Sequence, residues 1–395
     1  MDFDIGEEYR AVQETARRFV EREMIPLEPT VIRREAERGF TDAPLIPPEA
    51  EDRLRAAAKE AGLYGIDVPE RFGGQDLGLV TKAIVFEQMR RSIVPFVLPP
   101  ESPNLHLLAE TCKGSQIDRY LLPYARGEKR SCIAISEPGA GSDAGGIRTR
   151  AERRNGRWVL NGQKIWISNA AHADFIIVMA VTDASQGTRG GMTAFLVDKG
   201  MRGLSVPTCY PMIGEYAPYA VNLDDVELDD EQVLGEVGQA FVPISRRLGV
   251  RRMEIAARCL GVAGRCIEMM LEQAKQRSTF GTVLADRQAV QFWISDSWQE
   301  LEMCRLVVHR LAWRMDRGRE EDSLEIRREG AMAKVQCTEM ATRVVDRAIQ
   351  LFGGMGLSKL LPLEYMARVV RVWRIVEGPS EVHRWLIARD LLKGR

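Results

Sequence analysis

The sequence predicts an α+β protein in which a β-domain separates two helical regions. Near the start, apolar residues recur at helical spacing, at Ile5, Tyr9, Val12, Ala16, Phe19 and Val20. From residue 131 to about 235, short β-branched runs alternate with turn residues. Beyond Gly238 the helical spacing returns, for example at Leu301, Cys304, Val308, Leu311, Ala312 and Met315. We therefore expect three domains: helices over 1–130, a β-domain over 131–235 and helices over 236–395.

In the first region, Pro26 marks the end or a kink of the opening helix, because proline cannot donate a helical hydrogen bond. In the β-domain we expect hairpin turns at Asn155-Gly156 and Asn161-Gly162, since Asn-Gly pairs favour tight hairpin turns. Strands are expected at 175–180 and 192–197, joined by a polar surface loop over 183–191.

Composition limits the function classes. The 395 residues are 45% hydrophobic and 28% charged, as in globular proteins with a full core. Lys and Arg number 55 against 56 for Asp and Glu, so the net charge of −1 indicates neither nucleic-acid binding nor general membrane adsorption. No apolar run reaches membrane-spanning length.

The cysteines and histidines indicate no disulfide framework and no metal site. Seven cysteines occur singly, and an odd number in a large chain indicates reduced thiols. The four dispersed histidines form no set of metal ligands. The N-terminus is acidic and enters a helical pattern directly, unlike a signal or transit peptide, so we expect a cytoplasmic protein.

The most informative stretch runs from Ile133 to Asp143 and is followed by residues 164–169. Gly139 and Gly141 allow backbone to approach a ligand closely, and nearby serines and Trp166 add hydroxyls and a flat apolar face. This mixture predicts a binding site for an aromatic cofactor with a phosphate tail, namely a flavin.

Two other interpretations of this stretch remain open. Gly139-x-Gly141-x-x-Ala144 satisfies the dinucleotide fingerprint, but that fold needs a helix at the last position, and Gly145-Gly146 follows instead. A glycine-rich turn with a purely structural role is the second alternative.

Proton-transfer chemistry needs a base, and Glu377 is the best candidate. It lies beside Ile375 and Val376 and before Gly378-Pro379, which stops a helix. Apolar neighbours make a carboxylate a stronger proton acceptor. A solvated surface glutamate is the alternative, because most glutamates are exposed.

Taken together, five motifs resemble the acyl-CoA dehydrogenase family over almost the whole chain. They are Val68 to Gly74, one signature made of the E-P-G-A-G-S-D and N-G-x-K-x-W-I-S-N segments, Arg277 to Gly281 with Gln288, Gln350 to Gly356, and Glu377-Gly378. The resemblance implies a central β-barrel or sandwich and a C-terminal domain resembling a four-helix bundle. It also implies FAD as cofactor, an acyl-CoA substrate and an electron-transfer flavoprotein as electron acceptor.

The resemblance further implies roles for individual residues. Glu377 would remove the α-proton of an acyl-CoA while a hydride passes to the flavin, and its backbone N–H would help to stabilise the thioester oxygen. Relatives that carry the base on a helix have it where this chain has Arg251. The substrate contacts would be Ser142, Arg251, Arg252 and Gly378. The FAD contacts would be Ile133, Ile135, Ser136, Gly141, Ser142, Trp166, Ile167, Ser168, Arg277, Phe280, Gln288, Gln350, Gly353, Gly354, Pro379 and Glu381, partly from a neighbouring subunit of a homotetramer or homodimer.

Some residues depart from the family pattern. Pro379 stands where a threonine hydroxyl often meets the flavin, Val369 replaces an aspartate and Gly249 replaces a polar residue near CoA. Residues 99–106, in the region that lines the family's acyl pocket, are polar here, which an exposed loop also explains. Two rivals stay open: an acyl-CoA oxidase or non-oxidative relative acting on CoA or carrier-protein thioesters, and a non-catalytic flavin- or acyl-CoA-binding protein.

Overall fold

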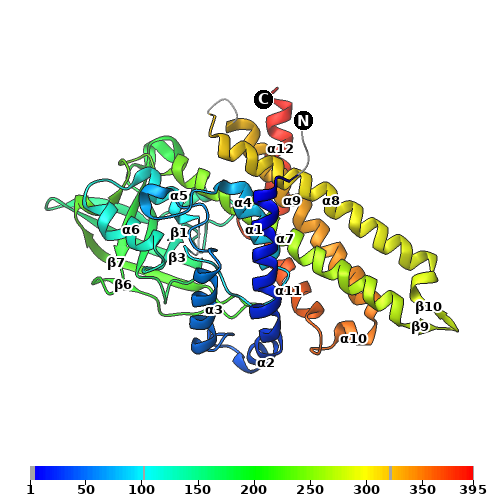
Figure 1. Cartoon of the computed structure of the whole chain (residues 1–395). Coiled ribbons are helices and arrows are strands. Elements are labelled where there is room, and N and C mark those ends of the chain that lie inside the picture. Colours follow the sequence, from blue (N-terminus) through cyan, green and yellow to red (C-terminus); the bar gives the residue numbers. More distant parts are fainter. Residues whose placement is uncertain (1–4, 101–102, 320–322, 395) are drawn as a thin grey trace.

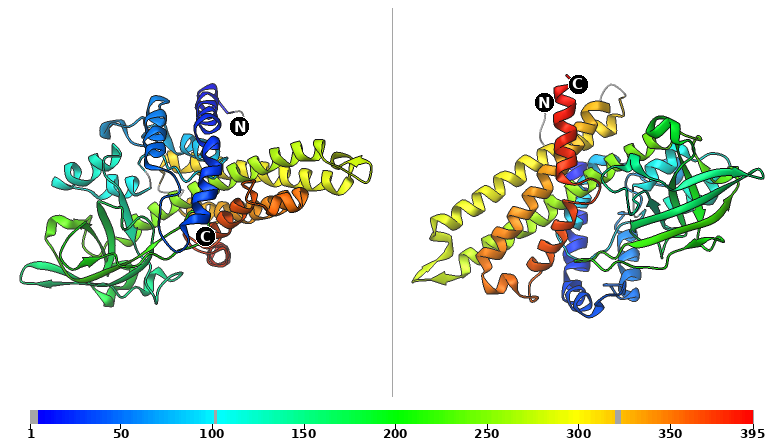
Figure 2. Two further views of the ribbon diagram at one scale, coloured as in Figure 1. Left: turned by 90° about the horizontal axis from the view of Figure 1, so that it is seen from below. Right: turned by 180° about the vertical axis from the view of Figure 1, so that it is seen from behind.

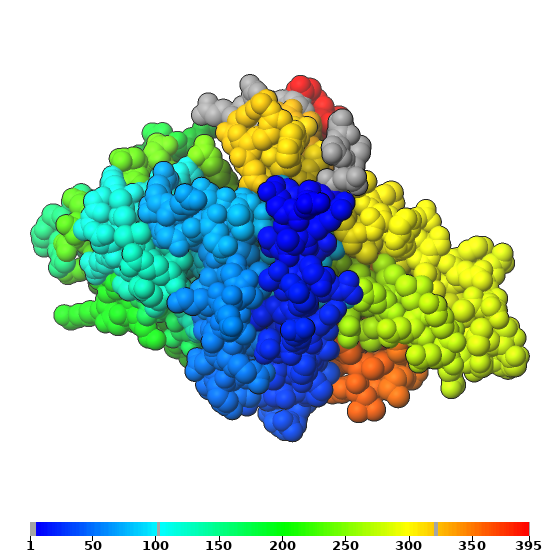
Figure 3. Space-filling model, in the orientation of Figure 1, coloured from blue at the N-terminus to red at the C-terminus, as the bar shows by residue number. Residues whose placement is uncertain are grey.

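The computed structural model describes residues 5–100, 103–319 and 323–394. The β-domain stands beside a helical body to which both the N-terminal and the C-terminal helices contribute (Figure 1). In the space-filling view, the N-terminal helices lie between the β-domain and the long C-terminal helices (Figure 3). The predicted α+β architecture is therefore confirmed.

The N-terminal helices begin with an interrupted helix. After α1, a π-helical turn, Val20–Met24, and a 3₁₀ turn, Ile25–Leu27, lead into α2, and the predicted break at Pro26 falls in the second of these turns. The helices are α1 (Glu7–Phe19), α2 (Glu28–Arg38), α3 (Pro48–Glu60), α4 (Gly78–Met89), α5 (Asn104–Thr111) and α6 (Leu122–Ala125).

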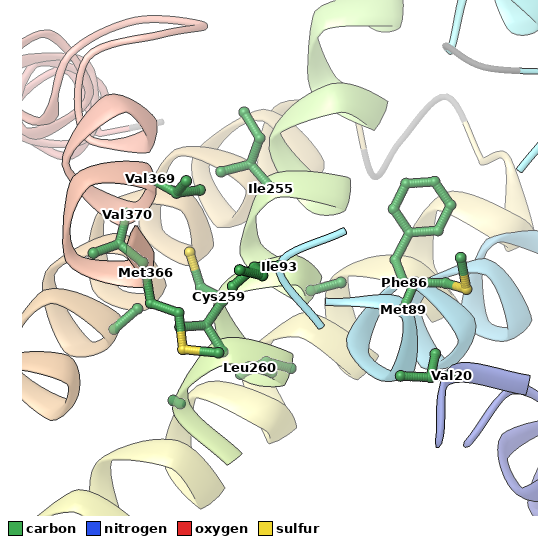
Figure 4. Close-up of a cluster of buried hydrophobic side chains, with 14 of the residues drawn as sticks. Val20, Phe86, Met89, Ile93, Ile255, Cys259, Leu260, Met366, Val369 and Val370 are labelled. Carbon is green, nitrogen blue, oxygen red and sulfur yellow. The ribbon is translucent and has the colours of Figure 1, made fainter. Parts of the chain in front are cut away.

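Helix α4 is the centre of the helical body. Nearly all of its residues are buried, which is why its sequence shows no polar face. It packs so closely on α7 (Phe241–Gln276) that a Cβ on Gly261 would lie 2.0 Å from the carbonyl oxygen of Glu87. Figure 4 shows the resulting core, in which Phe86 and Met89 of α4 and Cys259 of α7 belong to one cluster with α11. The N-terminal and C-terminal helices thus share a hydrophobic core.

The C-terminal region is built on three long helices, α7, α8 and α9. The apolar stripe predicted on α8 is confirmed, since Leu301, Cys304, Val308, Leu311 and Ala312 are buried and Met315 is partly buried against the same core. The remaining helices are α8 (Gln288–Arg317), α9 (Ser323–Phe352), α10 (Gly354–Leu357), α11 (Leu363–Trp373) and α12 (Ser380–Leu392). No helix of the described residues is long and apolar enough to cross a membrane.

The β-domain is an eight-stranded sheet in the order β6-β7-β3-β2-β4-β5-β8, with β1 paired to β4. Helix α5, the π-helical turn Ile117–Leu121 and helix α6 cover one face through Leu105, Tyr120 and Tyr124, respectively, while a second apolar cluster fills the other face. The strands are β1 (Ser131–Ala134), β2 (Arg150–Arg154), β3 (Arg157–Ile167), β4 (Phe175–Val181), β5 (Met192–Asp198), β6 (Leu204–Ser205), β7 (Tyr219–Leu228) and β8 (Val233–Leu234). A separate hairpin is formed by β9 (Ser278–Thr279) and β10 (Thr282–Val283).

One of the two predicted Asn-Gly turns is confirmed and the other is wrong. Asn155 and Gly156 have φ values of 51° and 81° and close the hairpin between β2 and β3. Asn161 and Gly162 lie instead inside β3, where the register against β7 shifts between Leu160 and Gly162. A Cβ on Gly162 would lie 2.4 Å from Oγ1 of Thr149, so this glycine serves close packing at a β-bulge.

Candidate active site

The candidate base Glu377 lies on the turn between α11 and α12. Its φ is +57°, in the left-handed region that non-glycine residues rarely adopt. Gly378 follows with φ +96°, and a Cβ there would lie 2.8 Å from Nε2 of His383. Backbone strain of this kind persists only where the surroundings fix it, and it is common at functional sites.

Three side chains from three helices hold the two carbonyl groups of this turn. Nε of Arg252 and Nε2 of His383 lie 3.2 and 3.1 Å from the Glu377 oxygen, and Nζ of Lys334 donates to the Gly378 oxygen at 2.6 Å. Burial, together with the charges of Arg252 and Lys334, lowers the pKa of His383 to about 3, so the ring is neutral and Nε2–H donates. Burial also lowers the pKa of Lys334 to about 8.

The Glu377 carboxylate points toward two arginines of α7. Its Oε1 lies 3.5 Å from Nη1 of Arg247 and 4.0 Å from Nε of Arg251. The Glu377 side chain is 21% exposed, so a ligand can reach it. The Glu377 N–H makes no hydrogen bond within the part of the chain that the structure describes, which leaves it available as a donor.

Arg247 was not among the residues predicted from the sequence. Its side chain is held in place by Asn104, which belongs to the polar segment 99–106. Nε of Arg247 donates to Oδ1 of Asn104 at 2.9 Å, and Nδ2 of Asn104 donates to Oγ of Ser131 at 2.9 Å. Asn104 is fully buried, as are the flanking prolines, so an exposed loop is the wrong explanation for this polarity. Glu101 and Ser102 of the same segment lie outside the described residues.

The glycine-rich stretch forms a tight turn with an open face. Glu137 and Ala140 exchange two backbone hydrogen bonds of 3.0 and 3.1 Å. A Cβ on Gly139 or Gly141 would have nothing within 4 Å, so their backbone is free to meet a ligand. The helix that a dinucleotide fingerprint requires is absent here, since residues 144–146 form only a short 3₁₀ turn.

Two charged residues, Glu137 and Lys164, hold the glycine-rich turn against β3. The Glu137 carboxylate accepts from the backbone N–H groups of Arg148 and Thr149 at 2.6 and 2.9 Å, and from Nζ of Lys164 at 2.8 Å. Nζ of Lys164 also donates to the carbonyl of Ile135. Burial lowers the pKa of Lys164 to about 8, against the opposing effect of Glu137. These two residues join β3 to the glycine turn.

Trp166 presents an apolar surface beside this turn. It has φ +60° and lies where the register of β3 against β7 shifts between Lys164 and Ile167, which turns the side chain out of the sheet. The indole is 53% exposed and its ring lies 4.8 Å from that of Tyr210. Ile133, Ile135 and Ser136 are partly buried and Gly141, Ser142 and Ser168 exposed, whereas the Ile167 side chain lies in the core and offers only its backbone.

The remaining expected cofactor contacts lie elsewhere. Pro379 and Glu381 open α12, next to Glu377. The others are exposed on the β9–β10 hairpin and the adjoining ends of the long helices: Arg277, Phe280, Gln288, Gln350, Gly353 and Gly354. This end of the long helices lies on the opposite side of the molecule from the β-domain (Figures 1 and 2). Within one chain, these residues therefore lie far from Trp166.

The sequence matches known protein domains over most of its length. The sequence matches the N-terminal domain of acyl-CoA dehydrogenase over residues 6–128, the middle domain over 132–226 and the C-terminal domain over 241–392. The chain belongs to the acyl-CoA dehydrogenase family. It is thus an FAD-dependent oxidoreductase that acts on CH–CH bonds.

Within the acyl-CoA dehydrogenases, one similar relative is the (R)-benzylsuccinyl-CoA dehydrogenase of Thauera aromatica. It is 48% identical over 99% of this chain and 97% of its own length. Among solved structures, the glutaryl-coenzyme A dehydrogenase complex with glutaryl-CoA has a TM-score of 0.88 at 28% identity, covering 100% of this chain and 98% of that one.

Two further solved structures resemble the chain over its full length. The FAD complex of PigA has a TM-score of 0.88 at 27% identity, with full coverage of both chains. A chain from the work on the electron transferring flavoprotein of Acidaminococcus fermentans has a TM-score of 0.86 at 28% identity, again with full coverage of both.

Proposed function

We propose that this protein dehydrogenates an acyl-CoA thioester to the 2-enoyl-CoA, with Glu377 as the base that takes the α-proton. The observation that carries the proposal is the turn between α11 and α12. It holds a partly exposed carboxylate in a strained conformation and anchors both of its carbonyl groups. A structural glutamate on the surface needs neither feature.

The α-proton of a thioester is weakly acidic, so the negative charge that develops on the carbonyl oxygen must be stabilised. The Glu377 N–H is a suitable donor, because it has no acceptor among the described residues and belongs to the same residue as the base. The anchored turn fixes both the proton acceptor and this donor relative to each other. Bound FAD supplies a hydride acceptor for the β-carbon.

The FAD site comes from two places in the chain. The glycine turn, Ser142, Ser168 and Trp166 suit the flavin ring and its ribityl chain. Arg277, Phe280 and Gln288 suit the pyrophosphate and adenine end, together with residues 350–354. These two sets of residues lie on opposite sides of one folded chain. We therefore propose that a second copy of the chain completes each site, in a homodimer or homotetramer. Phe280 is 99% exposed, as expected of a residue that contacts another chain.

The relatives favour a particular substrate and electron acceptor. The name of the 48% identical relative points to the CoA thioester of an aryl-substituted succinate as the first substrate to test. The similarity to a chain studied with an electron transferring flavoprotein supports such a flavoprotein as electron acceptor.

Anaerobic flavin bleaching by a panel of acyl-CoA thioesters tests the proposal. We expect benzylsuccinyl-CoA to reduce the bound FAD and its 2-enoyl product to be detectable by mass spectrometry. Admitting O₂ then separates a dehydrogenase, whose flavin reoxidises slowly without electron-transfer flavoprotein, from an oxidase. A protein that binds the thioesters without any bleaching contradicts the proposal and favours a non-catalytic binding role.

A further inference from the structure

We infer that Arg247 and Arg251 form a subsite for a second carboxylate on the acyl group. The preferred substrates are then CoA monothioesters of succinate-type dicarboxylic acids. This inference rests on the proposed function, because it places the subsite beside Glu377 acting as the base.

The two arginines converge on one point. They are four residues apart on α7 and therefore share a face of the helix, one turn from each other. Both lie within ion-pair distance of Oε1 of Glu377, at 3.5 and 4.0 Å. The side chain of Arg251 is 22% exposed, close to the 21% of Glu377, whereas that of Arg247 is only 5% exposed. An anionic oxygen placed where Oε1 of Glu377 now lies is therefore within ion-pair distance of both guanidinium groups.

Each arginine is held in place by buried groups behind it. Arg247 is anchored by Asn104, which is itself held by Ser131. Nη1 of Arg251 donates to Oε2 of Glu254 at 2.9 Å. Preorganised guanidinium groups bind a carboxylate with less loss of side-chain entropy than mobile ones do.

The anchor of Arg251 extends through a buried network of charges. Glu254 also pairs with Nζ of Lys82 at 2.9 Å, and Lys82 pairs with Asp67 at 2.7 Å. Nε2 of His106 lies 2.7 Å from the same Asp67 oxygen. The side chains of Lys82, Asp67 and Glu254 are at most 5% exposed, so water screens these pairs little. Arg251 is therefore fixed independently of Glu377.

A ligand bound in the subsite changes the surroundings of Glu377. With no substrate, the two arginines lie within ion-pair distance of the Glu377 carboxylate. A carboxylate on the substrate competes for the same guanidinium groups and releases Glu377. A substrate without this group leaves the two arginines beside Glu377.

The position of the arginines also sets the length of the acid. In a succinyl thioester, the carbon of the free carboxylate is the second atom from the α-carbon, whichever carboxyl group carries CoA. The arginines lie beside Glu377, the base that removes the proton from this α-carbon. A free carboxylate that binds to the arginines must therefore lie close to the α-carbon. A glutaryl thioester places its carboxylate one carbon further away, which fits this subsite less well.

A matched pair of substrates tests the inference: benzylsuccinyl-CoA and its amide, in which CONH₂ replaces the free carboxylate. Stopped-flow flavin reduction is measured for the holoenzyme and for R247Q, R251Q and the double variant. Arg246→Gln is the control, because Arg246 lies on the same helix but is exposed and pairs with Glu110. Circular dichroism and flavin content verify folding.

We expect wild type to prefer the carboxylate to the amide by about 100-fold or more, since each charged hydrogen-bonded pair contributes about ten- to hundred-fold. Each single variant should lose about ten-fold or more of this preference, and the double variant should lose nearly all of it. The rate with the amide should change by a much smaller factor than the rate with the carboxylate, because the amide forms no ion pair with either arginine. R246Q should keep the wild-type preference.

Two results overturn the subsite. One is an equal rate with carboxylate and amide in wild type, and the other is a double variant that loses both rates by the same factor, which indicates a purely structural role. Calorimetric affinities for the pair provide a readout without turnover. Suppose that no thioester bleaches the flavin, but that benzylsuccinyl-CoA binds about ten-fold or more tighter than its amide: the proposed function then fails and the subsite stands. Equal affinities of the two thioesters refute the subsite.

Discussion

Nζ of Lys334 on α9 lies 2.6 Å from the carbonyl oxygen of Gly378, the residue that follows the proposed base. The lysine is fully buried, and burial lowers the pKa of its ammonium group to about 8. A buried ammonium group that donates to a backbone carbonyl of this turn indicates that the conformation of the turn matters.

Lys334→Met retains most of the side-chain volume but removes the hydrogen bond to Gly378. We expect flavin reduction by substrate to slow by about ten-fold or more, because small displacements of a reacting group are costly. The comparison variant is Lys199→Met, which removes an exposed lysine that donates to the carbonyl of Ala171. Equal rates in the two variants would show that Lys334 does not position the base.

Glu377→Gln removes the proton acceptor and keeps the shape of the side chain. General bases typically contribute about 10²- to 10⁴-fold, and we expect a loss at or beyond the upper end of this range. FAD and acyl-CoA should still bind, because the glycine turn and the arginines are unchanged. Rapid-reaction absorbance of the flavin measures the rate, and near-normal reduction would mean that another carboxylate is the base.

A second variant tests whether α7 can supply the base. Nε of Arg251 lies 4.0 Å from Oε1 of Glu377, so Arg251→Glu in the Glu377→Gln background should restore part of the rate with the amide of benzylsuccinyl-CoA, which needs no cation at this position. Glu254 is the less suited alternative, because its side chain is only 1% exposed. Burial alone would raise its pKa, but the charges of Lys82, Arg251 and Arg258 outweigh this effect and hold the pKa at about 2. A Glu254→Gln variant as slow as Glu377→Gln, with normal folding, would argue against this order.

Trp166→Ala should weaken FAD retention, because the half-exposed indole offers a stacking surface that contributes about 1–3 kcal/mol. Phe40→Ala removes another exposed aromatic ring, at the end of α2, and serves as the control. Flavin release during dialysis against dilute guanidinium measures retention. Unchanged retention in Trp166→Ala would place the flavin elsewhere.

His383 should make the protein less stable in mild acid. Its pKa is about 3 in the folded state and about 6.5 when unfolded, so between these values the unfolded state binds the extra proton. The contribution to the free energy of unfolding is complete above pH 6.5 and falls by up to about 1.4 kcal/mol per pH unit below it. His383→Gln should reduce this loss in urea titrations at pH 7.5 and 5, and a variant that loses as much stability as wild type between these two pH values would contradict this account.

Local signals in the sequence were sufficient for much of the fold. The Asn155-Gly156 hairpin, the α8 stripe and the break at Pro26 each depend on neighbouring residues and were predicted correctly. Asn161-Gly162 was misassigned because a distant contact with Thr149 overrides its local preference for a turn.

The surroundings of Glu377 depend on contacts that no local pattern contains. The arginine closest to its carboxylate, Arg247, is 130 residues away in the sequence, and its anchor Asn104 comes from a third segment. The motif identified the candidate base, but only the packing of α5, α7 and α12 shows which groups control it. The expected cofactor contacts stay a prediction.

Trp166 in the β-domain and Phe280 on the β9–β10 hairpin lie far apart in one chain, and this separation affects how the protein retains its flavin. If FAD binds to Trp166 of one chain and Phe280 of another, every bound FAD links two chains. The fraction of sites that hold FAD then depends on the concentration of the protein as well as on that of free FAD. Dilution alone would then release flavin. By the same reasoning, mixing a chain defective at Trp166 with one defective at Phe280 would restore one intact site per mixed pair, so that two inactive proteins would complement each other.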